Sequence, residues 1–485
     1  MLNLIYFSGR YRIKTLPFTL KHDERFTIRL EHQINQHESK RLDCYFSIPK
    51  EMGVNPNTLD TDRFIMANVN GRRAYISQMM DLPLVQSRFI SRMKKDPASY
   101  RINLNVFVYH CLQALERETT ELQRIESPDE FYQALRPVMD LLESMLIRFR
   151  DAQPHEPRWQ VYFEQADNYL SWMIEQRLLK YLSRVQKSSS SNMERQRVLE
   201  FCQAERNYRD IQRYNSSVTM ADPNRIANKM ILLKRLIEQG VVFKEETHEL
   251  GRFARKVVKG VATAMVMVVV YSLVIEATSL LRGVTVALVG VLAIIYGFRE
   301  IFKDDIRQVI WNYLQRGRPI FFRRLMDGVS KKIVAQQKIW FSFIGQSDLP
   351  KHIDKMLRRR HQQNRQDAEF LYYRIDTMTN SESFRKGYQG IQEQIMFELS
   401  PLARHLERGR SSVFTEQNGK VSKSPIEKRY QMNLVVGIGQ SRDKKTIKEC
   451  QEFHRYKVTV NRSGVVEVEY GGEVKQEREP TRSSR

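Results

Sequence analysis

The chain has 485 residues, of which 41% are hydrophobic and 28% are charged. This apolar content is sufficient for packed cores, so it excludes a chain that is disordered throughout. Lys and Arg number 79 against 56 Asp and Glu, and the formal net charge of +23 favours an anionic partner such as lipid headgroups, nucleic acid or an acidic protein. The cysteines match no disulfide or metal-ligand spacing and are expected to be isolated thiols in a reducing compartment: Cys44, Cys111, Cys202 and Cys450.

Residues 1–95 are predicted to form a β-rich N-terminal module. Apolar residues alternate with polar ones over 26–34 and again over 42–48, with turn-prone residues between the two runs. Such alternation is typical of strands that bury one face. We therefore expect the two runs to pair as antiparallel neighbours.

Residues 96–256 are predicted to form a cytoplasmic helical bundle. One helix should begin at Ser127-Pro128, because Ser is a good N-cap and Pro is favoured at the first helical position. Its apolar residues recur at spacings of three and four, which predicts a seam against another helix: Phe131, Leu135, Val138, Leu142, Met145 and Phe149.

Residues 257–299 are predicted to form a two-helix transmembrane hairpin. Between Val257 and Phe298 the only charged residues are Lys259, Glu276 and Arg282. If the chain folds back at 276–282, each arm has roughly 18 residues and can cross about 27 Å at 1.5 Å per residue. Basic residues flank both ends, so the positive-inside rule places both flanking regions and both termini in the cytoplasm. The flanking residues expected to contact headgroups are Arg252, Arg255, Lys256, Lys259, Arg299 and Lys303.

Small residues share one face of each arm of this hairpin and are predicted to mediate membrane helix packing, because they let helix backbones approach closely in lipid. These residues are Gly260 and Ala264 in the first arm and Gly283, Ala287, Gly290 and Gly297 in the second. They could seal the two arms of one hairpin together, or they could form an intermolecular face and thus a homo-oligomer.

Residues 300–407 are predicted to form a basic cytoplasmic helical region. Within it, 320–344 reads as an amphipathic helix, with Arg324, Lys331 and Lys338 opposite an apolar face that includes Trp340. This helix could lie on the membrane, where its basic residues would contact headgroups, or it could pack in the soluble region.

The C-terminal part is predicted to contain a linker over 408–428, a small β module over 429–470 and a disordered tail over 471–485. The linker is low in apolar residues, and the β module shows alternating runs on either side of a turn at 461–464.

No catalytic residue, metal site or cofactor site is predicted, because the sequence has no zinc-protease, P-loop or nucleophile-elbow motif. Aromatic residues do not interleave with the basic runs in an RNA-binding pattern, so a nucleic-acid partner is disfavoured.

The predicted fold class is mainly α with small β pieces (α+β), with a two-span transmembrane helical hairpin between N-terminal and C-terminal cytoplasmic regions. We expect a non-enzymatic integral membrane protein that tethers interaction modules to a bilayer with anionic headgroups, as a scaffold, sensor or regulator. The alternatives are a homo-oligomeric pore-forming or membrane-perturbing effector, a membrane-anchored enzyme with an unrecognised site, and a soluble protein that buries the hairpin. The sequence does not identify a protein partner.

Overall fold

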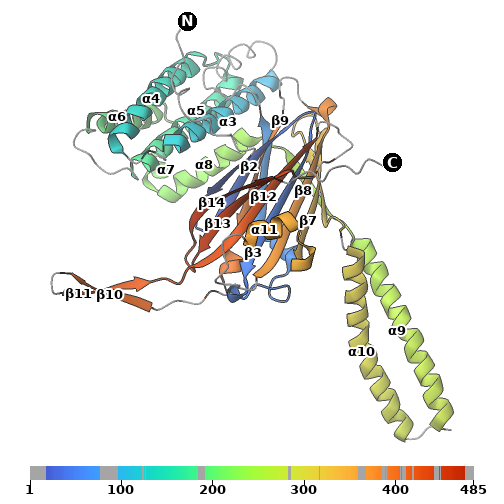
Figure 1. Ribbon diagram of the computed structural model, residues 1–485. Helices are drawn as coiled ribbons and strands as arrows, with labels where there is room; N and C mark the ends of the chain where they lie inside the picture. The colour runs from blue at the N-terminus through green and yellow to red at the C-terminus, as the bar shows by residue number, and fades with distance from the viewer. Residues whose placement is uncertain are drawn as a thin grey trace, which may run out of the picture.

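The structure of the chain is a computed structural model (Figure 1). It describes residues 18–23, 25–76, 97–122, 125, 127–183, 192–281, 286–315, 317–358, 368–384, 388, 390–404, 406, 411–417, 420–441, 447 and 449–475. About 51% of it is helical and 32% is strand, and most strands belong to large antiparallel sheets. The predicted fold class, mainly α with small β pieces, is therefore wrong.

The centre of the molecule is an antiparallel eight-stranded sheet in the order β14-β13-β12-β3-β8-β7-β6-β5. Its strands come from both ends and from the middle of the chain. In sequence order they are β3 (Ser39–Pro49), β5 (Lys244–Glu249), β6 (Phe321–Met326), β7 (Ile333–Ile344), β8 (Ala368–Thr379), β12 (Tyr430–Ser441), β13 (Glu452–Val460) and β14 (Val465–Lys475). The strands expected in 429–470 are present as β12, β13 and β14, but they extend this sheet and do not form a separate small sheet.

A four-stranded sheet packs against the larger one in the order β1-β2-β9-β4. Its strands are β1 (Phe18–His22), β2 (Thr27–Asn35), β9 (Gly390–Glu398) and β4 (Val69–Ile76). Apolar side chains of both sheets fill the space between them. Phe397 of β9, for example, contacts Phe46 of β3 and Tyr373 of β8, with ring centres 5.3 Å apart in both cases.

β2 and β3 correspond to the two alternating runs near the N-terminus, but the predicted pairing between them is wrong. β2 pairs with β9, whereas β3 lies between β12 and β8 in the other sheet. Thr379 holds the connection between the two strands, because its hydroxyl donates to the carbonyl oxygens of Gln36 and Glu38 at 2.8 and 2.9 Å. Alternation shows which face of a strand is buried, but it does not identify the neighbouring strand.

The helices that the structure describes between residues 97 and 238 form a helical domain beside the sheets (Figure 1). They are α3 (Pro97–Leu122), α4 (Pro128–Asp151), α5 (Pro157–Leu182), α6 (Asn192–Ile211), α7 (Ser217–Ala221) and α8 (Pro223–Glu238). The predicted helix at Ser127-Pro128 is α4, and its apolar seam is part of a continuous core. The shorter helices of the sheet region are α1 (Thr61–Asn68), α11 (Lys351–Arg358) and α12 (Ser400–Ala403).

Two long helices, α9 (Arg252–Leu281) and α10 (Val286–Gln315), project from the sheets as an antiparallel pair (Figure 1). We call this pair the arm. It lies on the opposite side of the sheets from the helical domain, and it is inserted between the adjacent strands β5 and β6.

The predicted two-span transmembrane hairpin is not supported. Among the described residues, one helix, Arg252–Ser279, is long and apolar enough to cross a membrane. The described apolar part of α10, Val286–Phe298, is about 20 Å long and ends at Arg299-Glu300, whereas a bilayer core is about 30 Å thick. The cytoplasmic placement of both termini depended on two spans, so it loses its basis.

The amphipathic helix predicted over 320–344 is also wrong, because this segment forms β6 and β7. The two strands pair antiparallel around a turn at 327–332. In this turn the Asp327 carboxylate accepts hydrogen bonds from the backbone N–H groups of Val329 and Ser330. Lys331 in the same turn adopts a φ of 55°. With β8 and β9, these strands make the described part of 300–407 richer in strand than in helix.

Candidate functional site

The arm begins and ends at one hydrogen-bonded junction. β5 and β6 pair as far as Glu249 opposite Phe321, and the next backbone bond runs from the N–H of Leu250 to the carbonyl oxygen of Ile320 at 2.8 Å. Gly251 follows with a φ of 92°, a left-handed conformation that favours glycine. A Cβ on Gly251 would also lie 3.2 Å from the indole of Trp311. The arm is thus an extension of an edge hairpin of the sheet.

α9 packs on α10 through one stripe and exposes the rest of its surface. The buried stripe has mostly four-residue spacing, which keeps its members on one helical face: Val258, Ala262, Val266, Val270 and Ala277. The other side is apolar but exposed to solvent, by 40–70% for most residues: Val257, Val261, Met265, Val268, Val269, Tyr271, Leu273 and Ile275. Only 22% of the most apolar part of α9 is buried, whereas a core helix of a soluble protein would be mostly buried.

The small residues predicted to pack the membrane helices lie away from the α9 stripe. A Cβ built on Gly260, Gly290 or Gly297 would meet no atom within 4 Å, and Ala264 is exposed. Gly283 lies outside the described residues, as does the side chain of Ala287. The option that Gly260, Gly290 and Gly297 seal the two helices of one arm therefore lacks support, while an intermolecular contact through them stays a prediction.

The basic residues predicted to contact headgroups at the start of α9 surround the junction. Lys256 and Lys259 are exposed. Arg252 is also exposed and pairs with Glu249 at 2.7 Å. Arg255 is more constrained, because its guanidinium lies 3.1 Å from Asp62 of α1 and 4.7 Å from the ring centre of Trp311. Arg255 therefore fastens the arm to the sheets, and the other three cations are available to an anionic surface.

The remaining predicted headgroup residues lie on α10, on two strands and in a turn. Arg299 and Lys303 are half-buried on α10 and both pair with Glu300, at 3.6 and 2.8 Å. Arg324 of β6 and Lys338 of β7 are exposed on the outer face of the sheet, and Lys331 is exposed in the turn between these strands. These last three cations therefore lie on strands and a turn, not on the predicted helix, and headgroup contact through them stays a prediction.

Three cation–aromatic pairs lie near the junction and were missed by the sequence analysis. The distances from guanidinium carbon to ring centre lie between 4.1 and 5.6 Å for Arg255–Trp311, Arg324–Phe322 and Arg374–Trp340. The Trp340 indole also donates to the carbonyl oxygen of Gly317 at 3.1 Å, at the C-terminal end of the arm. Trp and Arg are among the residues that favour a membrane–water interface. Arg255–Trp311 and Arg374–Trp340 each join two different elements, so no local sequence pattern reveals them.

A buried ionic cluster connects β5, the strand that leads into the arm, to the four-stranded sheet. Glu245 of β5 pairs with Arg73 of β4 at 2.8 Å, and Arg73 pairs with Glu393 of β9 at 2.5 Å. Burial alone would raise the pKa of Glu393, but the Arg73 guanidinium holds it well below its usual range. Burial lowers the pKa of the neighbouring His32, and it lowers the pKa of Lys40 to about 8. Ion pairs therefore link β5 to the four-stranded sheet.

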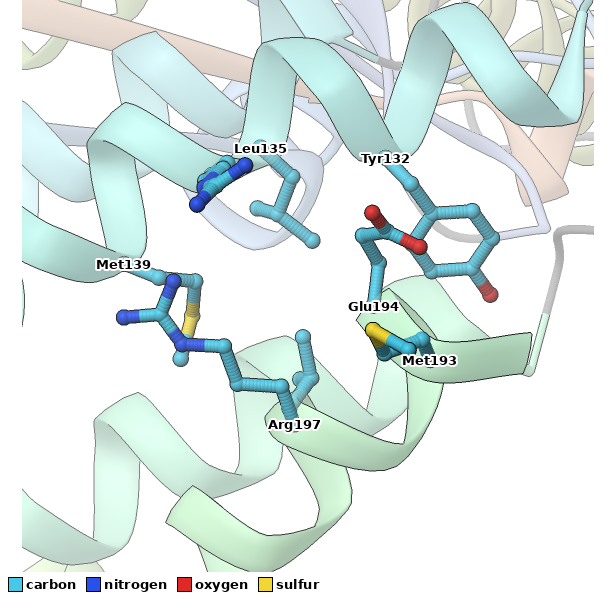
Figure 2. A pocket seen from close by; sticks show the side chains of 8 residues that line it. Tyr132, Leu135, Met139, Met193, Glu194 and Arg197 are labelled. Atoms are coloured by element: carbon cyan, nitrogen blue, oxygen red, sulfur yellow. The ribbon is translucent and has the colours of Figure 1, made fainter. Parts of the chain in front are cut away.

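A small hollow of roughly 120 Å³ opens between α4 and α6 of the helical domain (Figure 2). It is lined by Tyr132, Leu135, Arg136, Met139, Met193, Glu194, Arg197 and Val198. In Figure 2 the side chains of Leu135 and Met139 face those of Met193 and Arg197 across the opening. The hollow is smaller than the roughly 300–1,000 Å³ of typical small-molecule sites, so the arm is the stronger candidate.

Among the described residues no group of three or more His, Cys, Asp and Glu residues could hold a metal ion. All four cysteines are unpaired and buried. Comparisons with protein-family models, curated proteins and solved structures found no match.

Proposed function

We propose that this protein associates with a lipid bilayer through the arm and holds its sheet region and helical domain at the membrane as interaction modules. The observation that carries the proposal is the exposed apolar side of α9, where residues such as Val268 and Ile275 are more than 60% exposed. Soluble monomers rarely expose contiguous apolar surface of this extent, and burial in lipid stabilises it by about 25 cal/mol per Å².

The arrangement of charge around the arm supports a bilayer with anionic headgroups as the partner. Apolar side chains cover α9 from Gly260 to Ile275, and the exposed cations Arg252, Lys256 and Lys259 are confined to its first turns. A helix that enters lipid from this end keeps its cations among the headgroups, where each contributes about 1 kcal/mol with anionic lipid. The cation–aromatic pairs at the junction would then lie at the same level.

The role of the sheet region and the helical domain in this proposal is to bind a partner, without an enzymatic step. The ion pairs of Arg73 with Glu245 and of Arg255 with Asp62 join the base of the arm to the four-stranded sheet and to α1. In this proposal such contacts keep the binding modules close to the bilayer surface, as a scaffold or sensor requires.

Alkaline extraction of membranes from cells that express the full chain tests the proposal. Carbonate at high pH removes proteins held by charge alone and leaves those held by apolar insertion. We expect the chain to stay in the membrane pellet. Its complete release into the supernatant would overturn the proposal.

A further inference from the structure

A second projecting element, the hairpin of β10 (Ser411–Gln417) and β11 (Lys420–Ile426), lies where the sequence predicts a linker. It forms its own two-stranded sheet and extends from the sheets away from both the arm and the helical domain (Figure 1). None of its described side chains is buried. An isolated two-stranded hairpin is at best marginally stable in water, so its ordered form favours contact with another surface.

One face of this hairpin combines two apolar side chains with a lysine and a glutamate. The cross-strand register places Phe414 opposite Lys423 and Glu416 opposite Val421, so these four side chains share a face. Phe414 is 64% exposed and Val421 is 74% exposed. The Lys423 ammonium lies 5.8 Å from the centre of the Phe414 ring. We call this the Phe414–Val421 face.

The features of the hairpin favour contact through this face over strand addition at an edge. Lys423 and Pro425 stand in β11, and both residue types discourage the pairing of an edge with a further strand. The net charge of +23 disfavours a second copy of the chain as the occupant and favours an anionic surface. The face itself carries one charge of each sign, Lys423 and Glu416, so its preference for an anionic surface comes from the charge of the whole chain, and its exposed apolar pair matches the partly apolar headgroup region of a bilayer.

We propose that the β10–β11 hairpin is a second membrane contact, whose Phe414–Val421 face enters the headgroup region of an anionic bilayer. This inference rests on the proposed function and adds a residue-level contact distant from the arm. The contact is shallow, because the strands have 7 residues each and a spanning strand needs about 9–11. The unpaired edges of the hairpin also require water, which the hydrocarbon layer does not supply.

An environment-sensitive dye at position 414 tests the inference in the full chain. The four native cysteines are buried, so a thiol-reactive nitrobenzoxadiazole dye will label a new exposed cysteine selectively. The chain with Phe414→Cys is mixed with phosphatidylcholine vesicles with or without phosphatidylglycerol, and flotation is recorded on the same samples. Val421→Cys provides a second position on the same face. Met193→Cys, at a residue that is 82% exposed on α6, is the matched control.

We expect a several-fold rise and a blue shift of the dye emission at 414 and 421 with vesicles that contain phosphatidylglycerol, and no change at 193. If the chain floats with the vesicles while the emission at 414 and 421 stays constant, the hairpin is not a membrane contact and the proposed function stands. An equal rise at 193 would overturn the inference as well, since it would indicate general adsorption. A chain that does not float refutes the proposed function and this inference with it.

Discussion

Two lysines in the middle of the exposed side of α9 should abolish bilayer binding without unfolding the protein. The positions are Val268 and Val269, which are 68% and 59% exposed and lie near the centre of the apolar run. Their side chains contact mostly solvent, so their replacement should change the free energy of unfolding by no more than about 0.5 kcal/mol per residue.

The expected effect on membrane binding is much larger. A lysine near the centre of a membrane-inserted helix costs about 2.5–3.5 kcal/mol, so the double variant Val268→Lys/Val269→Lys should lose roughly 5–7 kcal/mol of binding free energy. Since about 1.4 kcal/mol corresponds to a tenfold change in affinity, the vesicle partition coefficient should fall about four orders of magnitude. Such a fall removes all detectable flotation.

The assay is flotation of the purified chain with phosphatidylcholine–phosphatidylglycerol vesicles, with circular dichroism to confirm the fold. The matched control is Ile231→Lys/Leu232→Lys on α8, where two adjacent apolar residues are 48% and 58% exposed on the helical domain. This control should float like the parent chain. Undiminished flotation of the α9 variant would refute the reasoning, and so would an equal loss in the α8 control.

Three further predictions concern the sheets and the arm. Arg73→Leu should lower the free energy of unfolding in urea by about 3–5 kcal/mol, because the buried Glu393 carboxylate loses its ion pair, and a loss below about 1 kcal/mol would count against this. Gly437→Ala should cost about 1–3 kcal/mol, since its Cβ would lie 2.4 Å from a ring carbon on the next strand. A Cβ on Gly290 of α10 would meet no atom within 4 Å, so Gly290→Ala should leave the free energy of unfolding unchanged or raise it by up to about 1 kcal/mol. If Gly437→Ala and Gly290→Ala had equal effects, the difference in space around these two glycines would be refuted. The pKa of Lys40 is about 8 in the folded protein against 10.5 ordinarily, so the unfolded chain binds more protons between these values and stability should rise with pH across that window, by up to roughly 3 kcal/mol. Lys40→Met should flatten this rise, and parallel pH profiles of the two proteins would show that Lys40 is not the cause.

The strands of the central sheets illustrate how far a local pattern can be read. The alternation over 26–34 and 42–48 correctly predicts strands, and β2 and β3 both follow it. Their partners β9 and β12 lie more than 300 residues away in the chain, and nothing in the local pattern specifies them. A turn-prone connection favours a hairpin, but here the chain crosses from one sheet to the other.

The error over 320–344 has an identifiable cause. Asp327-Gly328 is a strong hairpin-turn signal between two runs rich in β-branched and aromatic residues, and it could have been read as such. The polar residue Gln337 obscured the alternation of β7, because it occupies a fully buried position. Its amide donates to Glu393 at 2.9 Å, so the partner that makes this burial tolerable comes from the other sheet.

The sequence by itself determined the location of the apolar arm, the basic residues at its base, the helix that begins at Pro128 and several strands. These features depend on residues close together in the chain, whose spacing sets which side chains share a face. Tertiary structure alone decided how the strands are paired, which residues seal α9 against α10 and which partners Arg255 and Trp340 contact. These contacts join segments that are distant in the chain, and a local pattern shows which face of an element is buried but not which neighbour covers it.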